Sequence, residues 1–148
     1  MEHEEYMRRA IELARECLET GDVPVGCVVV SPTGEVIGRG RNRREELSSA
    51  TRHAEVEAIE AACRAVGSWR LEGCSLYVTL EPCPMCAGAI WNARLSNLWY
   101  GAREERSGCC GSVLNLFAEG FDRTTAVRGG LLEEPCAELL REFFRARR

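Results

Sequence analysis

The chain has 148 residues, of which 45% are hydrophobic and 28% charged, and its net charge is −4. These values are typical of a soluble globular domain and exclude a disordered chain, and the length favours one domain over residues 1–148. No apolar run is long enough to span a bilayer, and the first five residues are acidic where a secretion signal would be basic, so we expect a cytoplasmic protein with no membrane partner.

Cysteines and arginines are the unusual features of the composition. The nine cysteines are odd in number and no secretion signal precedes them, so we expect most to be reduced, some structural and some binding a metal. Lysine is absent, and arginines cluster over residues 39–44 and 145–148. The acidic net charge weighs mildly against a nucleic-acid partner, whereas these clusters are candidate phosphate-binding patches. On charge alone, two solvated basic patches are an equally good interpretation.

The first half of the chain begins with a helical pattern and continues with a strand pattern. Met7, Ile11, Ala14 and Leu18 recur at helical spacing, and the β-branched run that starts at Val25 is typical of a buried strand. Thr51 is a suitable N-cap for a second helix. The predicted elements are a helix over residues 4–20, a strand over 25–30, a turn over 31–34, a hairpin strand over 35–40, a loop over 41–49 and a helix over 53–66.

The second half alternates strands and helices. Pro84 suits the first turn of a helix, because a proline there loses no helical hydrogen bond. Strands that alternate with helices favour an α/β fold in which the later strands are largely parallel and helices cover both faces of the sheet. The predicted elements are strands over residues 75–80, 97–101 and 127–132, helices over 84–92 and 135–147, and a glycine-containing loop over 103–111.

Two short motifs carry residues suited to metal chemistry. One is His53-Ala54-Glu55 and the other is Pro82-Cys83-Pro84-Met85-Cys86, and each stands where a helix is predicted to begin. Cys83 and Cys86 are three residues apart, so on a helical turn their sulfurs share one face. A helix N-terminus favours the thiolate form that zinc requires. The spacing therefore predicts a zinc site that includes both cysteines.

His53 is the candidate third ligand. Three protein ligands leave the fourth tetrahedral position of zinc open, which is the arrangement of a catalytic site. A structural site would recruit a fourth ligand, and composition alone leaves that alternative open because further cysteines are available: Cys63, Cys74, Cys109 and Cys110.

Glu55 favours the catalytic interpretation. It lies about 200° around a regular helix from His53, so the two side chains converge only on a site beyond the helix end. A carboxylate beside an activated water accepts its proton and passes it to the leaving group. The H-x-E and P-C-x-x-C motifs together match the described signature of zinc nucleobase deaminases.

On these residues the chain resembles the cytidine deaminase superfamily and, within it, the tRNA adenosine deaminases. The resemblance implies a three-layer α/β/α cytidine-deaminase-like fold with a mixed five-stranded sheet, one Zn²⁺ per chain, a homodimer, and conversion of adenosine to inosine at anticodon position 34 of tRNA. The matching segments span nearly the whole chain: residues 22–26, 40–42, 51–55, 76–87, 100–102, 111–112 and 143–145.

The same resemblance assigns residues to the substrate. Asn42 and the backbone of Ala54 would hold a flipped adenine, and Val25 would line its pocket. Glu104 occupies the position of a family aspartate that contacts the RNA, and Arg106 replaces a common lysine. Both departures leave fine substrate preference open.

Arginines and aromatic residues complete the expectations. Arg44, Arg145 and Arg147 are candidate contacts to the tRNA anticodon stem-loop, with Arg41, Arg43 and Arg148 beside them. Phe143 and Phe144 are predicted to face the core. Trp91 is a candidate for the homodimer interface.

Two other functions remain open. A small-molecule deaminase acting on guanine, cytidine or a deoxynucleotide would carry the same zinc motifs but would not need the arginines. A catalytically inactive relative, serving as a zinc module or as one half of a heterodimer, typically lacks the glutamate that stands here at position 55.

Overall fold

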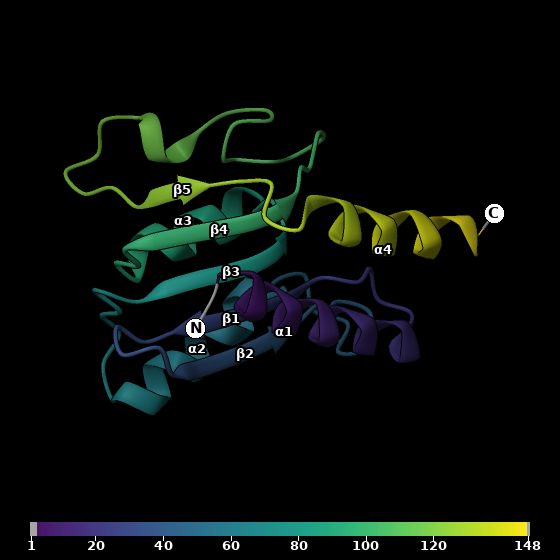
Figure 1. Cartoon of the computed structure of the whole chain (residues 1–148), viewed down its shortest axis with the longest axis horizontal. Helices are drawn as coiled ribbons and strands as arrows, with labels where there is room; N and C mark the ends of the chain where they lie inside the picture. The colour runs from purple at the N-terminus through teal and green to yellow at the C-terminus, as the bar shows by residue number, and fades with distance from the viewer. Residues whose placement is uncertain (1–2, 148) are drawn as a thin grey trace.

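A computed structural model describes residues 3–147, which form a five-stranded sheet with helices on both faces (Figure 1). Within this range no helix is both long enough and apolar enough to cross a membrane. The elements are α1 (His3–Glu16), a 3₁₀ turn (Cys17–Thr20), β1 (Gly26–Val30), β2 (Val36–Arg41), α2 (Ala54–Val66), β3 (Ser75–Leu80), α3 (Pro84–Asn92), β4 (Asn97–Ala102), a second 3₁₀ turn (Leu116–Ala118), β5 (Ala126–Arg128) and α4 (Glu133–Arg145).

The sheet is mixed, with strand order β2-β1-β3-β4-β5. Strand β1 pairs antiparallel with both β2 and β3, whereas β3, β4 and β5 run parallel to one another. Helix α3 is the crossover between the parallel strands β3 and β4, as parallel pairing requires. The predicted hairpin and the parallel second half are both confirmed, and so is the mixed five-stranded sheet of an α/β fold.

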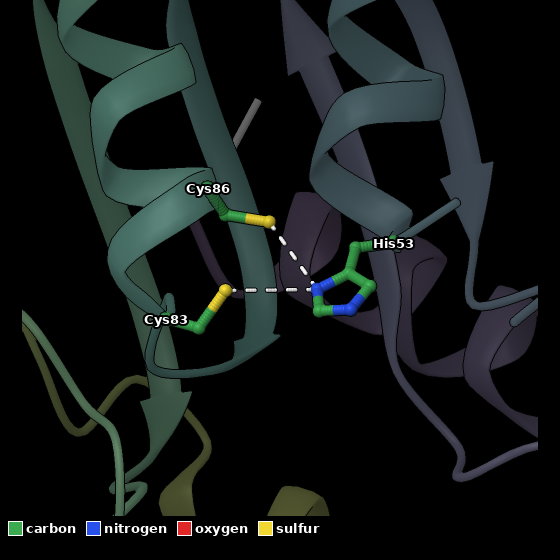
Figure 2. A group of neighbouring side chains, drawn as sticks. All are labelled: His53, Cys83 and Cys86. Atoms are coloured by element: carbon green, nitrogen blue, oxygen red, sulfur yellow. Dashed lines mark hydrogen bonds between the residues drawn. The ribbon is translucent and has the colours of Figure 1, made fainter. Parts of the chain in front are cut away.

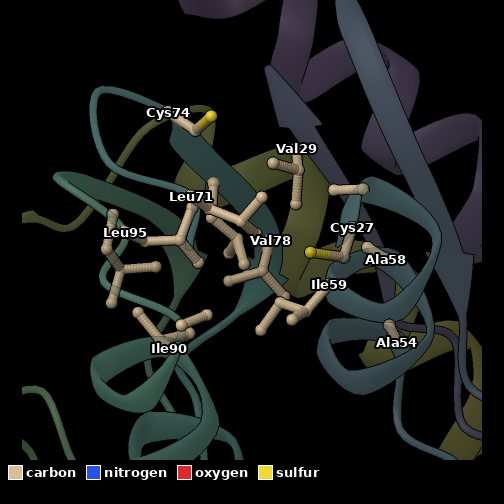
Figure 3. Close-up of a cluster of buried hydrophobic side chains, with 14 of the residues drawn as sticks. Cys27, Val29, Ala54, Ala58, Ile59, Leu71, Cys74, Val78, Ile90 and Leu95 are labelled. Carbon is tan, nitrogen blue, oxygen red and sulfur yellow. The ribbon is translucent and has the colours of Figure 1, made fainter. Parts of the chain in front are cut away.

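Two cores form because successive side chains of a strand point to opposite faces of the sheet. Cys27 and Val29 of β1 pack with α2 and α3, whereas Val28 and Val30 pack with α1 and α4. Figure 3 shows the first core, where Ile59 of α2 meets the sheet residues. Burial on both faces explains why β1 reads as a continuous apolar run without alternation.

The first helix differs from its prediction in its last turn. Residues 17–20 tighten into a 3₁₀ turn that ends at Gly21, which has a φ of 75°. A 3₁₀ turn has three residues per turn, so it rotates later side chains away from the face that α1 buries. Leu18, predicted on the apolar face, is therefore exposed.

Two other boundaries differ from the sequence pattern. The N-cap of α2 is His53 and not Thr51, because Thr51 lies in a turn and His53 itself is still extended, with a ψ of 158°. Strand β5 has only three residues, Ala126–Arg128, and covers two of the six residues predicted over 127–132. It stops before Gly129, which packs against the Tyr100 ring, and Gly130, which takes a φ of 87° that no strand accommodates.

The packing of α2 on β2 depends on glycine. Gly38 faces α2, and a Cβ at this position would overlap the carbonyl oxygen of Ala58. The small side chains of Ala58 and Ala62 complete this close approach. The missing side chain therefore sets the distance between α2 and the sheet.

This contact yields a stability prediction. Gly38→Ala should lower the free energy of unfolding by about 1–3 kcal/mol, because the overlapping atom is rigid backbone. The matched control is Gly88→Ala in α3, where an added Cβ meets nothing within 4 Å. That change should raise stability by about 0.5–1 kcal/mol through better helix propensity. Urea unfolding of both variants checks the pair, and equal stability for the two would contradict this account of the packing.

Candidate active site

His53, Cys83 and Cys86 lie together where α2 and α3 begin. His53 is the N-cap of α2, Cys83 is the N-cap of α3, and Cys86 lies in the first turn of α3. Their ligand atoms all lie within 4.8 Å of one another. Figure 2 shows Nδ1 of His53 turned toward the two sulfurs from the neighbouring helix. Two helix N-termini therefore bring three metal-ligating atoms to one point.

The spacing of these atoms fits zinc. The His53 Nδ1 atom is 3.7 Å from the Cys83 sulfur and 3.5 Å from the Cys86 sulfur. Zinc bonds of about 2.3 Å to sulfur and about 2.0 Å to nitrogen, meeting at a tetrahedral angle, place sulfur and nitrogen about 3.5 Å apart. Among residues 3–147 the cluster has three members, and they do not include the cysteines that a structural site could recruit: Cys63, Cys74, Cys109 and Cys110.

The electrostatics of the cluster favour a thiolate. Hydrogen bonding from the Cys86 thiol, with a further contribution from His53, lowers the pKa of Cys83 to about 4. The same contact with Cys83 raises the pKa of Cys86, and the Cys83 thiolate raises the pKa of His53. Cys83 is thus ionised at neutral pH, and the N-terminal dipole of α3 supports its charge.

Glu55 lies beside this cluster in the first turn of α2. Its side chain is only 4% exposed. Burial raises the pKa of the Glu55 carboxyl to about 7. A carboxyl group with a pKa near the ambient pH is suited to accept a proton and to release it again.

A cleft of about 940 Å³ opens at this edge of the sheet. Strand β1 begins at this edge and β2, β3 and β4 end there, so the segments that follow these strands form the cleft walls. His53, Glu55 and Cys83 line the cleft, while Cys86 is buried behind them. Open sheets commonly bind ligands at the carboxyl ends of their parallel strands.

The residues assigned to the base by resemblance also line the cleft: Val25, Asn42, Ala54 and Glu104. The Asn42 side chain is already engaged in its own loop. Its Nδ2 donates to the Val23 carbonyl at 3.1 Å and its Oδ1 accepts from the Arg44 N–H at 3.1 Å. The second lone pair of Oδ1 stays available to a ligand. Asn42 therefore combines a structural role with a place in the cleft wall.

Some arginines of the two predicted clusters line the cleft, and others pair with acidic residues outside it. Arg44 and Arg147 line the cleft. Arg145 points elsewhere and pairs with Glu138 at 3.1 Å. Arg41 pairs with Glu46 at 3.0 Å and Arg43 pairs with Glu57 at 2.6 Å, so acidic partners hold these two side chains away from the cleft. Arg148 lies outside the described residues.

The aromatic pair on α4 is divided as well. Phe143 is buried as predicted, but the prediction for Phe144 is wrong, since 52% of its side chain is exposed. The two residues are adjacent on an amphipathic helix, so they cannot both face the same core. Both line the cleft, which gives its far wall an apolar surface.

Two buried carboxylates escaped the sequence analysis. Asp22 accepts hydrogen bonds from the N–H groups of Glu45 and Glu46, and so holds the loop that carries Arg44. Glu81 accepts hydrogen bonds from the loop that follows β4. The available signal for Glu81 was a lone acid at the end of an otherwise apolar buried strand.

The chain is similar to known deaminases in sequence and in fold. The cytidine and deoxycytidylate deaminase zinc-binding region matches residues 1–102. The tRNA-specific adenosine deaminase of Bacillus subtilis is 47% identical over 141 residues, covering 95% of this chain and 87% of that protein. A solved structure from studies of A-to-I editing by tRNA:A34 deaminases superposes with a TM-score of 0.87 at 43% identity, covering 92% of this chain and 99% of the other.

Guanine deaminases share the fold. A solved structure of the guanine deaminase from Nitrosomonas europaea gives a TM-score of 0.84 at 25% identity, covering 96% of this chain and 84% of that one. A guanine deaminase structure from Bacillus subtilis is 42% identical but covers only 70% of this chain, whereas the tRNA enzymes reach 43–47% identity over 92–95% of it. On that relationship and the clustered His53, Cys83 and Cys86, the chain belongs to the tRNA-specific adenosine deaminase family within the cytidine and deoxycytidylate deaminases.

Proposed function

We propose that this protein hydrolyses adenosine to inosine at wobble position 34 of a tRNA anticodon, with one zinc ion per chain. The observation that carries the proposal is one cleft that holds a zinc-compatible cluster, a buried glutamate and exposed arginines. Its relatives are named for the same reaction. We place the activity in the cytoplasm, where tRNA is found.

The metal would be held by His53, Cys83 and Cys86. When bound, zinc supplies Lewis-acid activation of a water molecule at neutral pH. Glu55 takes one proton from the attacking water and delivers it to N1 of adenine. It then takes the remaining hydroxyl proton of the adduct and delivers it to the departing amino group. A bond forms from the water oxygen to C6, the C6–N bond breaks, and ammonia leaves.

The cleft walls suit a base that has left its stack. Val25 and Ala54 provide apolar surface next to Glu55, and Asn42 offers an acceptor. An adenine in an anticodon loop leaves its stack at little cost, whereas a duplex hides its reactive carbon. The base contacts alone would accept a free nucleoside. Discrimination in favour of tRNA therefore has to come from the outer cleft, where Arg44 and Arg147 can reach phosphates.

A small-molecule deaminase is the alternative, favoured by the shared fold of the guanine deaminase. One experiment separates the two. The purified protein is incubated with total tRNA, with an anticodon stem-loop, and with free adenosine, guanine and cytidine in parallel. Inosine at position 34 with little turnover of the small substrates supports the proposal. Comparable turnover of a free base or nucleoside would replace it with the alternative, and no turnover of any substrate would favour a catalytically inactive relative.

We further propose a homodimer formed around α3. The exposed apolar side chains of Val113, Leu114 and Phe121 support this assembly. Trp91 is partly covered within its own chain, because its indole donates to the Arg123 carbonyl at 3.2 Å and its ring contacts Phe121. Light scattering should give twice the chain mass at micromolar concentration, and a monomeric mass would refute the dimer.

Glu55→Gln tests the proton transfer. The amide keeps the shape of the side chain but accepts no proton, so turnover should fall by about 10²–10⁴-fold. Zinc content by mass spectrometry should stay at one per chain, since Glu55 is outside the ligand cluster. Cys86→Ser is the comparison variant and should lose zinc together with activity. Near-normal turnover by Glu55→Gln would mean that another group moves the proton.

Arg147→Ala tests the outer cleft. A lost phosphate contact should weaken anticodon stem-loop binding and reduce the slope of log K against log salt by about 0.7. The matched control is Arg145→Ala, two residues away on the same helix end but paired with Glu138 outside the cleft. Filter binding measures the affinity of both variants from roughly 50 to 300 mM salt, the range over which salt screens such phosphate contacts. If Arg147→Ala and Arg145→Ala have the same affinity for the anticodon stem-loop and the same salt slope, Arg147 does not contact RNA as proposed.

A further inference from the structure

We infer that Glu81 is a positioning residue that holds the loop of residues 103–112 over the cleft and thereby sets the affinity for RNA. This inference rests on the proposed function. Glu81 immediately precedes the Pro82-Cys83 turn and is 2% exposed. Its carboxylate is directed away from the metal cluster and toward the loop that follows β4.

Both oxygens of Glu81 accept hydrogen bonds from that loop. Oε1 accepts from the N–H of Glu104 at 3.1 Å and from the hydroxyl of Ser112. Oε2 accepts from the N–H of Cys110 at 2.9 Å and from the N–H of Ser112 at 3.0 Å. One side chain thus satisfies three backbone donors that are spread over nine residues of an irregular loop.

Packing around the carboxylate is tight as well. A Cβ at Gly108 would overlap the carboxylate carbon of Glu81, so the loop backbone lies directly against it. Cys109 donates its N–H to the Pro82 carbonyl at 2.9 Å. The loop is therefore fastened to the same turn that carries Cys83, and few contacts of regular secondary structure support it otherwise.

The tethered loop supplies one wall of the cleft. Glu104, Arg106 and Ser107 all line it, and the backbone of Glu104 is itself held by Glu81. Glu55 and the metal cluster stand on α2 and α3 and are not members of this loop, which is bonded to their turn at the Pro82 carbonyl. Release of the loop should therefore weaken substrate binding while the chemistry of bound substrate continues.

Glu81→Gln is the first test. In the amide, an NH₂ donor replaces one of the two carboxylate oxygens and faces backbone N–H donors. The hydrogen bonds that this oxygen accepted are therefore lost. We expect KM for the anticodon stem-loop to rise about tenfold or more, since hydrogen bonds to a charged group are the strong ones. We expect kcat to change by less than about threefold, because only uniform binding is removed. Zinc should remain at one per chain.

Hydrogen exchange provides a readout that does not depend on RNA. The amides of Glu104, Cys110 and Ser112 should exchange faster in Glu81→Gln, while the peptide containing Cys83 and Cys86 keeps its protection. If the unaltered protein makes no inosine, the proposed function fails, and this exchange result alone then decides whether Glu81 tethers the loop. Unchanged exchange in the loop would overturn the inference.

Gly108→Ala is the second test, because it displaces the same loop and leaves Glu81 intact. It should raise KM in the same way, and the double variant should be no worse than the more severe single variant, since both changes release one loop. Thr125→Val is the control for general destabilisation. It removes a buried hydrogen bond to the Leu95 carbonyl where β4 and β5 begin, at the end of these strands away from the cleft. Its KM should be unchanged. Strictly additive effects would show that the two changes do not act through one loop. A loss of zinc and kcat in Glu81→Gln would show that Glu81 supports the metal motif instead of the loop. Either result would overturn the inference.

Discussion

The site depends on one constraint, the convergence of the N-termini of α2 and α3 at a single edge of the sheet. Neither helix alone supplies a metal site, because His53 comes from one and Cys83 and Cys86 come from the other. The convergence follows from topology. Strand β3 leads through Cys83 into α3, and β2 leads through a loop to His53. Close packing of α2 on Gly38 then fixes the distance between α2 and the sheet.

Two buried glutamates near this point show how surroundings decide the role of a carboxyl group. Burial is the dominant influence on the Glu55 carboxyl and raises its pKa to about 7. Burial also raises the pKa of Glu81, but the hydrogen bonds from Ser112, Cys110 and Glu104 outweigh it and the pKa falls below its ordinary value. Glu55 can therefore exchange protons near neutral pH, whereas Glu81 remains a charged anchor.

Much of this architecture was predictable from periodicity and spacing. The apolar run at Val25–Val30 indicated a buried strand, and the three-residue spacing of Cys83 and Cys86 indicated a shared helical face. The fine assignment of a substrate came from resemblance, since neither the pairing of H-x-E with P-C-x-x-C nor the fold distinguishes tRNA from guanine.

The failures of prediction share a physical origin, which is that they depend on contacts made only in the folded chain. Arg41 and Arg43 looked like free cations, but Glu46 of the following loop and Glu57 of α2 pair with them. Phe144 lies on the exposed side of a helix whose neighbours the sequence does not reveal. Glu81 looked like part of a motif, and its function as an anchor appears only when residues 104–112 fold back over it.

The most direct test of the central claim is X-ray absorption at the zinc edge of the purified protein. Convergence of the two helices predicts two sulfur ligands at about 2.3 Å and one imidazole nitrogen at about 2.0 Å, from Cys83, Cys86 and His53. A third sulfur ligand would contradict the account, because it would mean that a cysteine outside the cluster closes the coordination and that the site is structural.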